Sequence, residues 1–272
     1  MAATKVTRNN QFYGLAIGYV IVAGGYAGGP ISGGCFNPAV AFGIDVPSAG
    51  LGFGWSFAYL AYELIGAALA AGPYRVVHPE EYSPGATAIL GVKCCSEFIG
   101  TFFLVMTVGL NVLGKSPAGA WSIAASLMCM IYALGAVSGA HFNPAVTLAI
   151  FLSGRGKMSG AGEMGAYMGT QIVAGILAAF TYVAIFKGET FPLQPGKGYG
   201  HGEAAMAEIV FTFVLCFVVL SVATTKDASK DVFGLAIASS VTVGGNAIGA
   251  ISGGSLNPAV SFGTPAERAP WR

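Results

Sequence analysis

The sequence predicts an all-α membrane protein, a bundle of about seven transmembrane helices with inverted repeats and short half-helices. Three observations support this fold class. The 272 residues are 54% hydrophobic and only 9% charged, whereas soluble domains usually carry about 25% charged residues. Apolar stretches of roughly 20 residues, the length that spans a bilayer, follow one another along the chain. The sequence Asn-Pro-Ala-Val occurs three times, beginning at Asn37, Asn143 and Asn257.

The composition also excludes several function classes. The formal net charge of +1 provides no basic face, so we expect no nucleic-acid partner. The five cysteines show no metal-ligand spacing, and no Ser/His/Asp or Cys/His arrangement stands out. We therefore expect no metal, no cofactor, no catalytic residue and no enzyme activity. The 41 glycines suit close contacts between helices in a membrane.

Each Asn-Pro-Ala motif has the chemistry of a helix start. Asn is a good N-cap, Pro fits the first helical position, and the preceding Ser-Gly lets the chain turn tightly. One such motif indicates only a capped helix. Three motifs that each follow a long apolar segment indicate helix starts inside the membrane. Such helix starts are tolerated only where they are buried in protein or lie beside a cavity. The pattern predicts a pore whose motif residues include Pro38, Ala39, Pro144, Ala145, Pro258 and Ala259.

The expected elements follow in order along the chain. Apolar spans are predicted over residues 12–30, 54–74, 94–113, 120–137, 163–186, 204–224 and 232–250. Short helices begin after each motif Asn, the first of them over 38–43. A polar stretch at 78–84 separates two pieces. We therefore divide the chain into residues 1–92 and residues 93–272.

Two internal repeats are visible. A span with a Glu, a second span and a motif helix recur, with 143 − 97 = 46 residues from Glu97 to Asn143 and 257 − 208 = 49 from Glu208 to Asn257. An odd number of spans per unit inverts the second unit. This second unit lacks the closing span that residues 163–186 supply to the first. Residues 12–43 also align with 232–263 without gaps, at an offset of 257 − 37 = 220.

These motifs resemble those of the aquaporins, the major intrinsic proteins. Residues 138–148 and 252–263 resemble the two pore loops of that family, and residues 97–102 and Gln171 look like its first-span and third-span signatures. The motif at 37–43 looks most like the second pore loop of the plant tonoplast branch. A standard member has six spans and two Asn-Pro-Ala loops.

The order of the segments is unlike that of the family. Residues 12–74 look like a fifth span, a pore loop and a sixth span, and they precede the first five spans and both loops. This order fits a circular permutation with a surplus piece, and it equally fits a window cut from a tandem protein. A third interpretation takes 12–74 as second span, first pore loop and third span, and the Phe-Gly after the motif argues against it.

The resemblance assigns roles to named residues. Asn143 and Asn257 are expected to present N–H donors in the pore, where the positive ends of two half-helices meet and repel cations. Glu97 and Glu208 are expected to hold the pore loops by accepting backbone N–H bonds. Many aquaporins carry Arg after the second motif, where this chain has Val. The filter positions that the resemblance implies, which include neither Arg nor His, are Ile123, Gly245, Gly254 and Val260.

The sequence therefore predicts a passive channel for water and small neutral solutes such as glycerol, urea, ammonia or hydrogen peroxide, excluding protons. The resemblance implies a homotetramer in a lipid bilayer, in a vacuolar or other intracellular membrane, with the plasma membrane as the alternative. The competing hypothesis is a non-conducting structural membrane subunit with the same fold. An ion-coupled transporter ranks last, because the spans carry little charge besides Glu63, Glu97 and Glu208.

Overall fold

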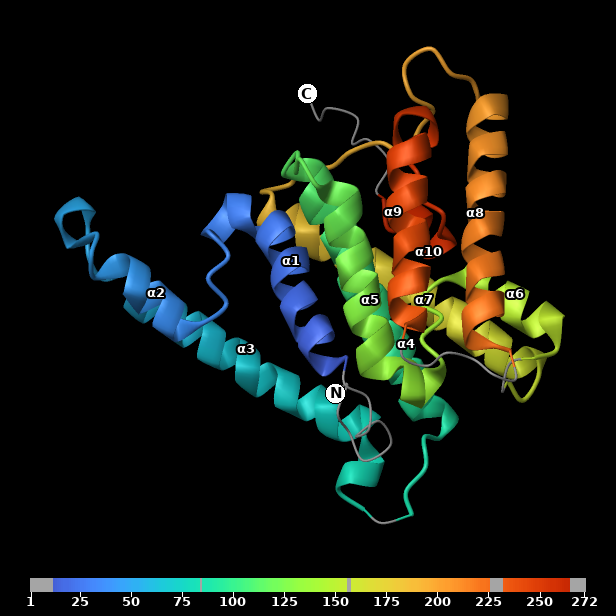
Figure 1. The fold of residues 1–272 in the computed structure, drawn as a ribbon, viewed down its shortest axis with the longest axis horizontal. Helices are drawn as coiled ribbons and strands as arrows, with labels where there is room; N and C mark the ends of the chain where they lie inside the picture. The colour runs from blue at the N-terminus through green and yellow to red at the C-terminus, as the bar shows by residue number, and fades with distance from the viewer. Residues whose placement is uncertain (1–11, 84, 156–157, 226–231, 265–272) are drawn as a thin grey trace.

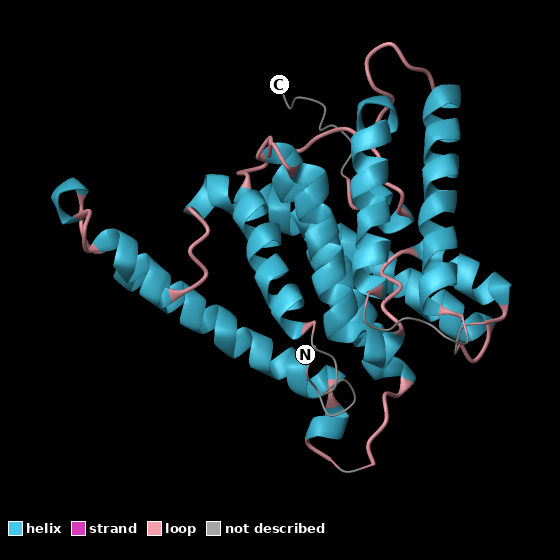
Figure 2. Ribbon diagram, viewed as in Figure 1, coloured by secondary structure: helices cyan, strands magenta, loops and turns pink. Residues whose placement is uncertain are grey.

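The computed structural model describes residues 12–83, 85–155, 158–225 and 232–264, and these residues form α-helices, two short 3-10 helices and no strand. Figures 1 and 2 show the helices and the loops that connect them. The α-helices are α1 (Tyr13–Ser32), α2 (Pro38–Asp45), α3 (Trp55–Val77), α4 (Leu90–Leu113), α5 (Gly119–Ser138), α6 (Pro144–Ser153), α7 (Ala161–Ile185), α8 (His201–Ala223), α9 (Phe233–Ser252) and α10 (Pro258–Phe262).

Every predicted span is found as a helix, with ends that differ by a few residues from the expected ones. Among the described residues, six helices are long and apolar enough to cross a membrane: α1, α4, α5, α7, α8 and α9. Six of the seven expected spans thus meet this criterion. The seventh, predicted over 54–74, forms α3 but does not reach the same hydropathy, because Glu63 and several tyrosines interrupt its apolar residues.

The bundle consists of two helical units that enclose the half-helices α6 and α10. In the first unit α4 packs against α5 and α7, in the second α8 packs against α9, and α5 joins the units by packing against α9. Glycines permit the closest approaches: a Cβ at Gly109 would lie 2.1 Å from the ring of Tyr182, and one at Gly175 would lie 2.3 Å from the carbonyl oxygen of Ala259. Small residues thus bring the helices and half-helices together, as expected for a membrane bundle.

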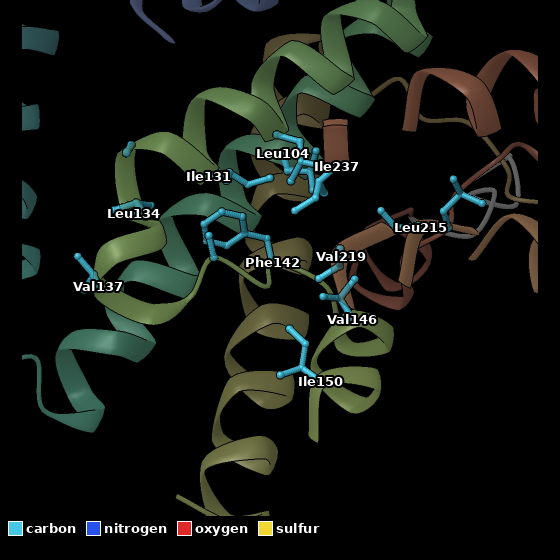
Figure 3. Close-up of a cluster of buried hydrophobic side chains, with 14 of the residues drawn as sticks. Leu104, Ile131, Leu134, Val137, Phe142, Val146, Ile150, Leu215, Val219 and Ile237 are labelled. Atoms are coloured by element: carbon cyan, nitrogen blue, oxygen red, sulfur yellow. The ribbon is translucent and has the colours of Figure 1, made fainter. Parts of the chain in front are cut away.

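An apolar core fills the space between the units. Its buried side chains come from α4, α5, α6, α8 and α9, from Val77 at the end of α3, and from Phe142 and Leu256 in the loops before α6 and α10. Figure 3 shows part of this cluster, with Leu104, Ile131, Val146, Leu215, Val219 and Ile237 among the labelled residues. Because both units contribute to one core, their half-helices are held at a defined place between them.

The N-terminal helices do not complete this bundle. α1 packs against α5 and α4, where Ser122 Oγ donates to the carbonyl of Ala23 at 2.8 Å and Cys129 Sγ donates to that of Ala16 at 3.1 Å. The main partner of α2 is α3, and α3 makes a smaller contact with α4. In Figure 1 both α2 and α3 extend away from the bundle on the side of α1.

The two units differ in how well their first helix is covered. In the most apolar 18-residue stretch of α4, 56% of the residues are buried, against 11% in α8. The main neighbours of α8 are α9 and α6, whereas α4 is packed against α1, α5 and α7. Among the described residues, α8 therefore has an open flank.

Candidate functional site

The half-helices α6 and α10 are built in the same way from their motifs. Asn143 and Asn257 are N-caps with extended backbones, and a Pro follows each at the first helical turn. The Oδ1 of Asn143 accepts the N–H of Ala145 at 2.8 Å, and that of Asn257 accepts the N–H of Ala259 at 2.9 Å. The predicted capped helix starts are thus present in both motifs.

The two motif loops are joined crosswise by their asparagines. Asn143 Nδ2 donates to the carbonyl of Leu256 at 2.8 Å, and Asn257 Nδ2 donates to the carbonyl of Phe142 at 2.9 Å. Phe142 and Leu256 both have a φ of 51°, an uncommon value for a bulky residue. This arrangement holds the N-termini of the two half-helices against each other, so that their free N–H groups and positive ends lie at one place.

Glu97 holds the first loop from inside the protein. This side chain has no solvent exposure. Its Oε1 accepts the N–H of His141 at 3.0 Å and the hydroxyl of Ser138 at 2.6 Å. Its Oε2 accepts the N–H of Phe142 at 2.7 Å and the Nε2–H of Gln171 at 2.8 Å. With these four donors the carboxylate is satisfied although it is buried.

Glu208 holds the second loop in the equivalent way. Its Oε1 accepts the N–H of Ser255 at 3.0 Å and the hydroxyl of Ser252 at 2.6 Å, and its Oε2 accepts the N–H of Leu256 at 2.9 Å. Glu208 is only partly buried. Both glutamates therefore accept backbone N–H groups of the loops, which is the geometry that the predicted loop-holding role requires.

A cavity of about 630 Å³ lies beside the two motifs. Asn143 and Asn257 both line it. The four predicted filter residues also line it, although they come from three different parts of the chain: Ile123, Gly245, Gly254 and Val260. Much of the remaining wall belongs to the apolar core, including Leu104, Ile131, Val146, Leu215, Val219 and Ile237.

The filter positions are packed closely around small residues. A Cβ added at Gly254 would lie 3.3 Å from the Cα of Gly245, and one added at Gly245 would lie 3.1 Å from the Cβ of Ala120. Val260 is 6% exposed. None of the four positions carries a charged side chain or an N–H donor, so this part of the wall is apolar.

Several residues of the site were not predicted. Ser138 and Ser252 donate to the two glutamates, and the signal that could have identified them is the Ser-Gly before each motif. A segment over 191–194 also lines the cavity, and Gly196 anchors it by donating to the carbonyl of Ile251 at 2.8 Å. No sequence pattern indicated that this polar connection returns to the cavity.

His141 packs within the first loop and also lines the cavity. Its side chain is 7% exposed and its Nδ1 lies 3.2 Å from the hydroxyl of Thr147. Its ring also contacts that of Tyr167, with centroids 5.2 Å apart. Among the described residues, no group of three His, Cys, Asp or Glu side chains is placed to hold a metal ion.

The third motif is not part of this site. Asn37 caps α2 by accepting the N–H of Ala39 at 2.9 Å, so its local structure matches that of the other motifs. However, α2 packs mainly against α3, and no other motif faces Asn37. Asn37, Pro38 and Ala39 are absent from the residues that line the cavity. The structure therefore does not bring this motif to the predicted pore, and Val40 is 43% exposed where Val260 is buried.

Comparison with known proteins identifies the family. The sequence model described as "Major intrinsic protein" matches residues 1–109 and 86–267. The chain belongs to the major intrinsic protein family. Membership and its six apolar helices make it an integral, multi-pass membrane protein.

Individual relatives are about one third identical to this chain over the residues that align. Aquaporin NIP1-1 of Zea mays is 36% identical over 183 residues, which cover 63% of this chain and 63% of that protein. Aquaporin NIP2-1 of Oryza sativa subsp. japonica is 36% identical over 188 residues, covering 63% and 59%. The chain thus spans less than two thirds of the length of these curated relatives. Their names are of the NIP type, so they do not support the expected likeness to the tonoplast branch.

A solved structure has a similar fold. The aquaglyceroporin from Plasmodium falciparum superposes with a TM-score of 0.53 at 20% sequence identity, covering 64% of this chain and 79% of that chain. At this identity the likeness establishes the aquaporin-like fold alone.

Proposed function

We propose that the protein is a passive transmembrane channel for water and small neutral solutes, without a cofactor. The observation that supports this most strongly is the pair Asn143 and Asn257 in the cavity wall. Each amide has two N–H groups, and the crosswise bonds to the opposite loop use one of them. The other is available to a passing molecule, which accepts hydrogen bonds there. A water held in this way cannot relay a proton, and the positive helix ends repel cations.

The filter composition determines the solutes that we propose. Ile123, Gly245, Gly254 and Val260 supply neither charge nor donor, so a wide and weakly polar constriction is expected. Glycerol, urea, ammonia and hydrogen peroxide are the candidate solutes. Relatives named as aquaporins support a channel of this class.

Stopped-flow light scattering of proteoliposomes tests the proposal. Fast shrinkage in an impermeant sugar and fast re-swelling in glycerol are expected. Val260→Arg places a charged donor in the cavity wall and should lower glycerol permeability by roughly tenfold or more while water still passes. The matched control is Val40→Arg, at the same position of the motif that lies away from the cavity, and it should leave both rates unchanged. Equal loss in the two variants would contradict the assignment of the filter.

A non-conducting structural subunit is the second candidate. The open flank of α8 favours it, since no helix closes the second unit within the described residues. The same experiment separates the two functions: folded protein whose liposomes shrink no faster than empty ones supports the structural subunit.

The order of segments, the assembly and the membrane complete the proposal. We infer that residues 1–92 hold the end of one aquaporin-like copy and residues 93–272 most of another. The two overlapping family matches support this division. A homotetramer, and a vacuolar or other intracellular membrane with the plasma membrane as alternative, remain predictions from family resemblance. Blue-native electrophoresis and membrane fractionation test them.

A further inference from the structure

Two helices of the chain each present an apolar face that little of the chain covers. On α8, Met206, Ile209, Phe213 and Phe217 are 64%, 66%, 64% and 59% exposed, and their spacing places them along one side of the helix. On α3, exposed apolar residues occur along most of the length, among them Trp55, Phe57, Leu64, Ile65 and Leu69. Lipid covers apolar side chains in a membrane, but the internal repeats indicate a more specific partner for each face.

α8 repeats α4. Glu97, Thr101 and Phe102 recur as Glu208, Thr212 and Phe213 at a constant offset of 208 − 97 = 111. Both glutamates hold a motif loop through backbone N–H groups. In the first unit α4 is covered by α7, and the second unit has no helix in the corresponding place within the described residues.

α3 repeats α7. The two helices align at a constant offset of 171 − 63 = 108, and several residues are identical between them. At one aligned position α3 has Glu63 where α7 has Gln171. The identical residues include Tyr59, Leu69, Ala70, Ala71 and Tyr74, which match Tyr167, Leu177, Ala178, Ala179 and Tyr182. From this double correspondence we propose that α3 of one chain packs on α8 of a second copy of the chain as α7 packs on α4, closing that copy's second unit.

The second copy is the favoured partner because α1 anchors the N-terminal helices in place. The hydrogen bonds from Ser122 and Cys129 to the backbone of α1 are buried. In Figure 1, α3 extends from the side of the bundle that carries α1, whereas α8 lies on the opposite side beyond α5 and α9. To reach α8 of its own chain, α3 would have to pull α1 away from α5. A neighbouring chain offers the same surface without that loss.

Glu63 opposes the proposed contact and therefore provides a test of it. Neither of its carboxylate oxygens contacts solvent or has a hydrogen-bond partner among the described residues. A carboxylate within a membrane helix is costly unless protein groups surround it. Docked as α7 docks on α4, Glu63 would face Glu208 as Gln171 faces Glu97. Two facing carboxylates weaken this contact, whereas a glutamine would donate to Glu208.

Disulfide formation between two differently tagged chains tests the contact. Val105 of α4 and Ala178 of α7 lie in one buried cluster. Their counterparts are the native Cys216, at 105 + 111, and Ala70, at 178 − 108. One chain carries Ala70→Cys with Cys216→Ser, and the other chain is unmodified. Mild oxidation in membranes should link the two chains, and replacing Cys216 by Ser in the second chain should remove the link.

Matched variants keep the test decisive. Leu69→Cys with Cys216→Ser should not link, because its counterpart Leu177 is 44% exposed and faces away from α4. Size-exclusion chromatography shows whether Ala70→Cys disturbs folding. If it does, the next pair is Ala71→Cys in one chain and Ser221→Cys in the other. The counterparts of these two residues, Ala179 and Leu110, lie in one buried cluster. Adding Glu63→Gln should raise the linked fraction by about twofold or more, because it replaces a carboxylate by a donor.

Two outcomes would overturn the proposal. One is a disulfide within a single chain when Ala70→Cys is combined with native Cys216, which would mean that α3 closes its own bundle. The other is no link above the Leu69→Cys level between folded, co-purified chains. Both disulfide measurements report how the chains assemble and do not measure permeation. Their result is therefore independent of the proposed channel function.

Discussion

The two units of the bundle contain equivalent parts and differ in one helix. In each, a Glu on the first helix accepts two backbone N–H groups of a motif loop and the hydroxyl of the Ser before it. In the part of the chain that the structure describes, only the first unit has a closing helix, α7, which brings Gln171 to Glu97 as a fourth donor. The closing helix thus turns a partly exposed loop support into a fully buried one.

This comparison has an energetic consequence. A carboxylate in contact with solvent can lose a partner and regain a water, whereas a buried one leaves every former partner unsatisfied. The network around Glu97 is therefore expected to be obligatory for folding. The network around Glu208 is expected to be more tolerant for as long as its flank remains open. Three comparisons between variants test this expectation, in order of decreasing effect.

The largest effect is expected for Glu97→Ala compared with Glu208→Ala. Loss of Glu97 leaves the buried N–H groups of His141 and Phe142 without an acceptor, and each such group costs about 1–3 kcal/mol. We expect Glu97→Ala to destabilise the protein by roughly 3 kcal/mol or more and Glu208→Ala by about half as much. Thermal unfolding of the purified protein in detergent measures the difference. Equal losses would show that α7 adds nothing to the first loop.

Gln171→Ala should have an intermediate effect. It removes the donor that distinguishes the two units and leaves the loop N–H groups bonded, so the first unit would come to resemble the second. A loss of about 1.5–3 kcal/mol is expected, because Gln171 Nε2 donates to Glu97 and also to Thr147 Oγ1 at 3.0 Å, and both buried bonds are lost. Thr181→Ala, on the exposed face of the same helix, is the control and should change the unfolding temperature little. If Gln171→Ala leaves the unfolding temperature unchanged, the hydrogen bond from Gln171 does not contribute to the stability of the Glu97 network.

The smallest effect concerns a pair of phenylalanines at equivalent positions. Phe102 of α4 is partly buried and stacks on Phe98, with ring centroids 6.1 Å apart. Phe213 of α8 is 64% exposed. Phe102→Ala should destabilise dilute protein by roughly 1–2 kcal/mol, and Phe213→Ala by less than about 0.5 kcal/mol. If a second copy covers α8, the effect of Phe213→Ala grows with protein concentration. A constant effect across concentrations would mean that the α8 face stays uncovered.

Much of this architecture could be predicted from local sequence. The apolar spans, the Asn-Pro helix starts and the two glutamates were all identified before the structure, and the helices match the predicted ranges to within a few residues. These features depend on neighbours in the chain. An N-cap needs its own next two residues, and a span needs only enough consecutive apolar side chains.

The packed fold decided the rest. Three motifs carry the same Asn-Pro-Ala-Val and the same local cap, yet only Asn143 and Asn257 face each other, because only α6 and α10 belong to units of opposite orientation in one core. The segment 191–194 lines the cavity, and α3 contributes only its last residue, Val77, to the buried core. No local sequence pattern predicts either placement. Such contacts join residues that are far apart in the chain, as Asn143 and Leu256 are. These contacts depend on which apolar helix faces have complementary shapes and pack together, and that is determined only when the helices assemble.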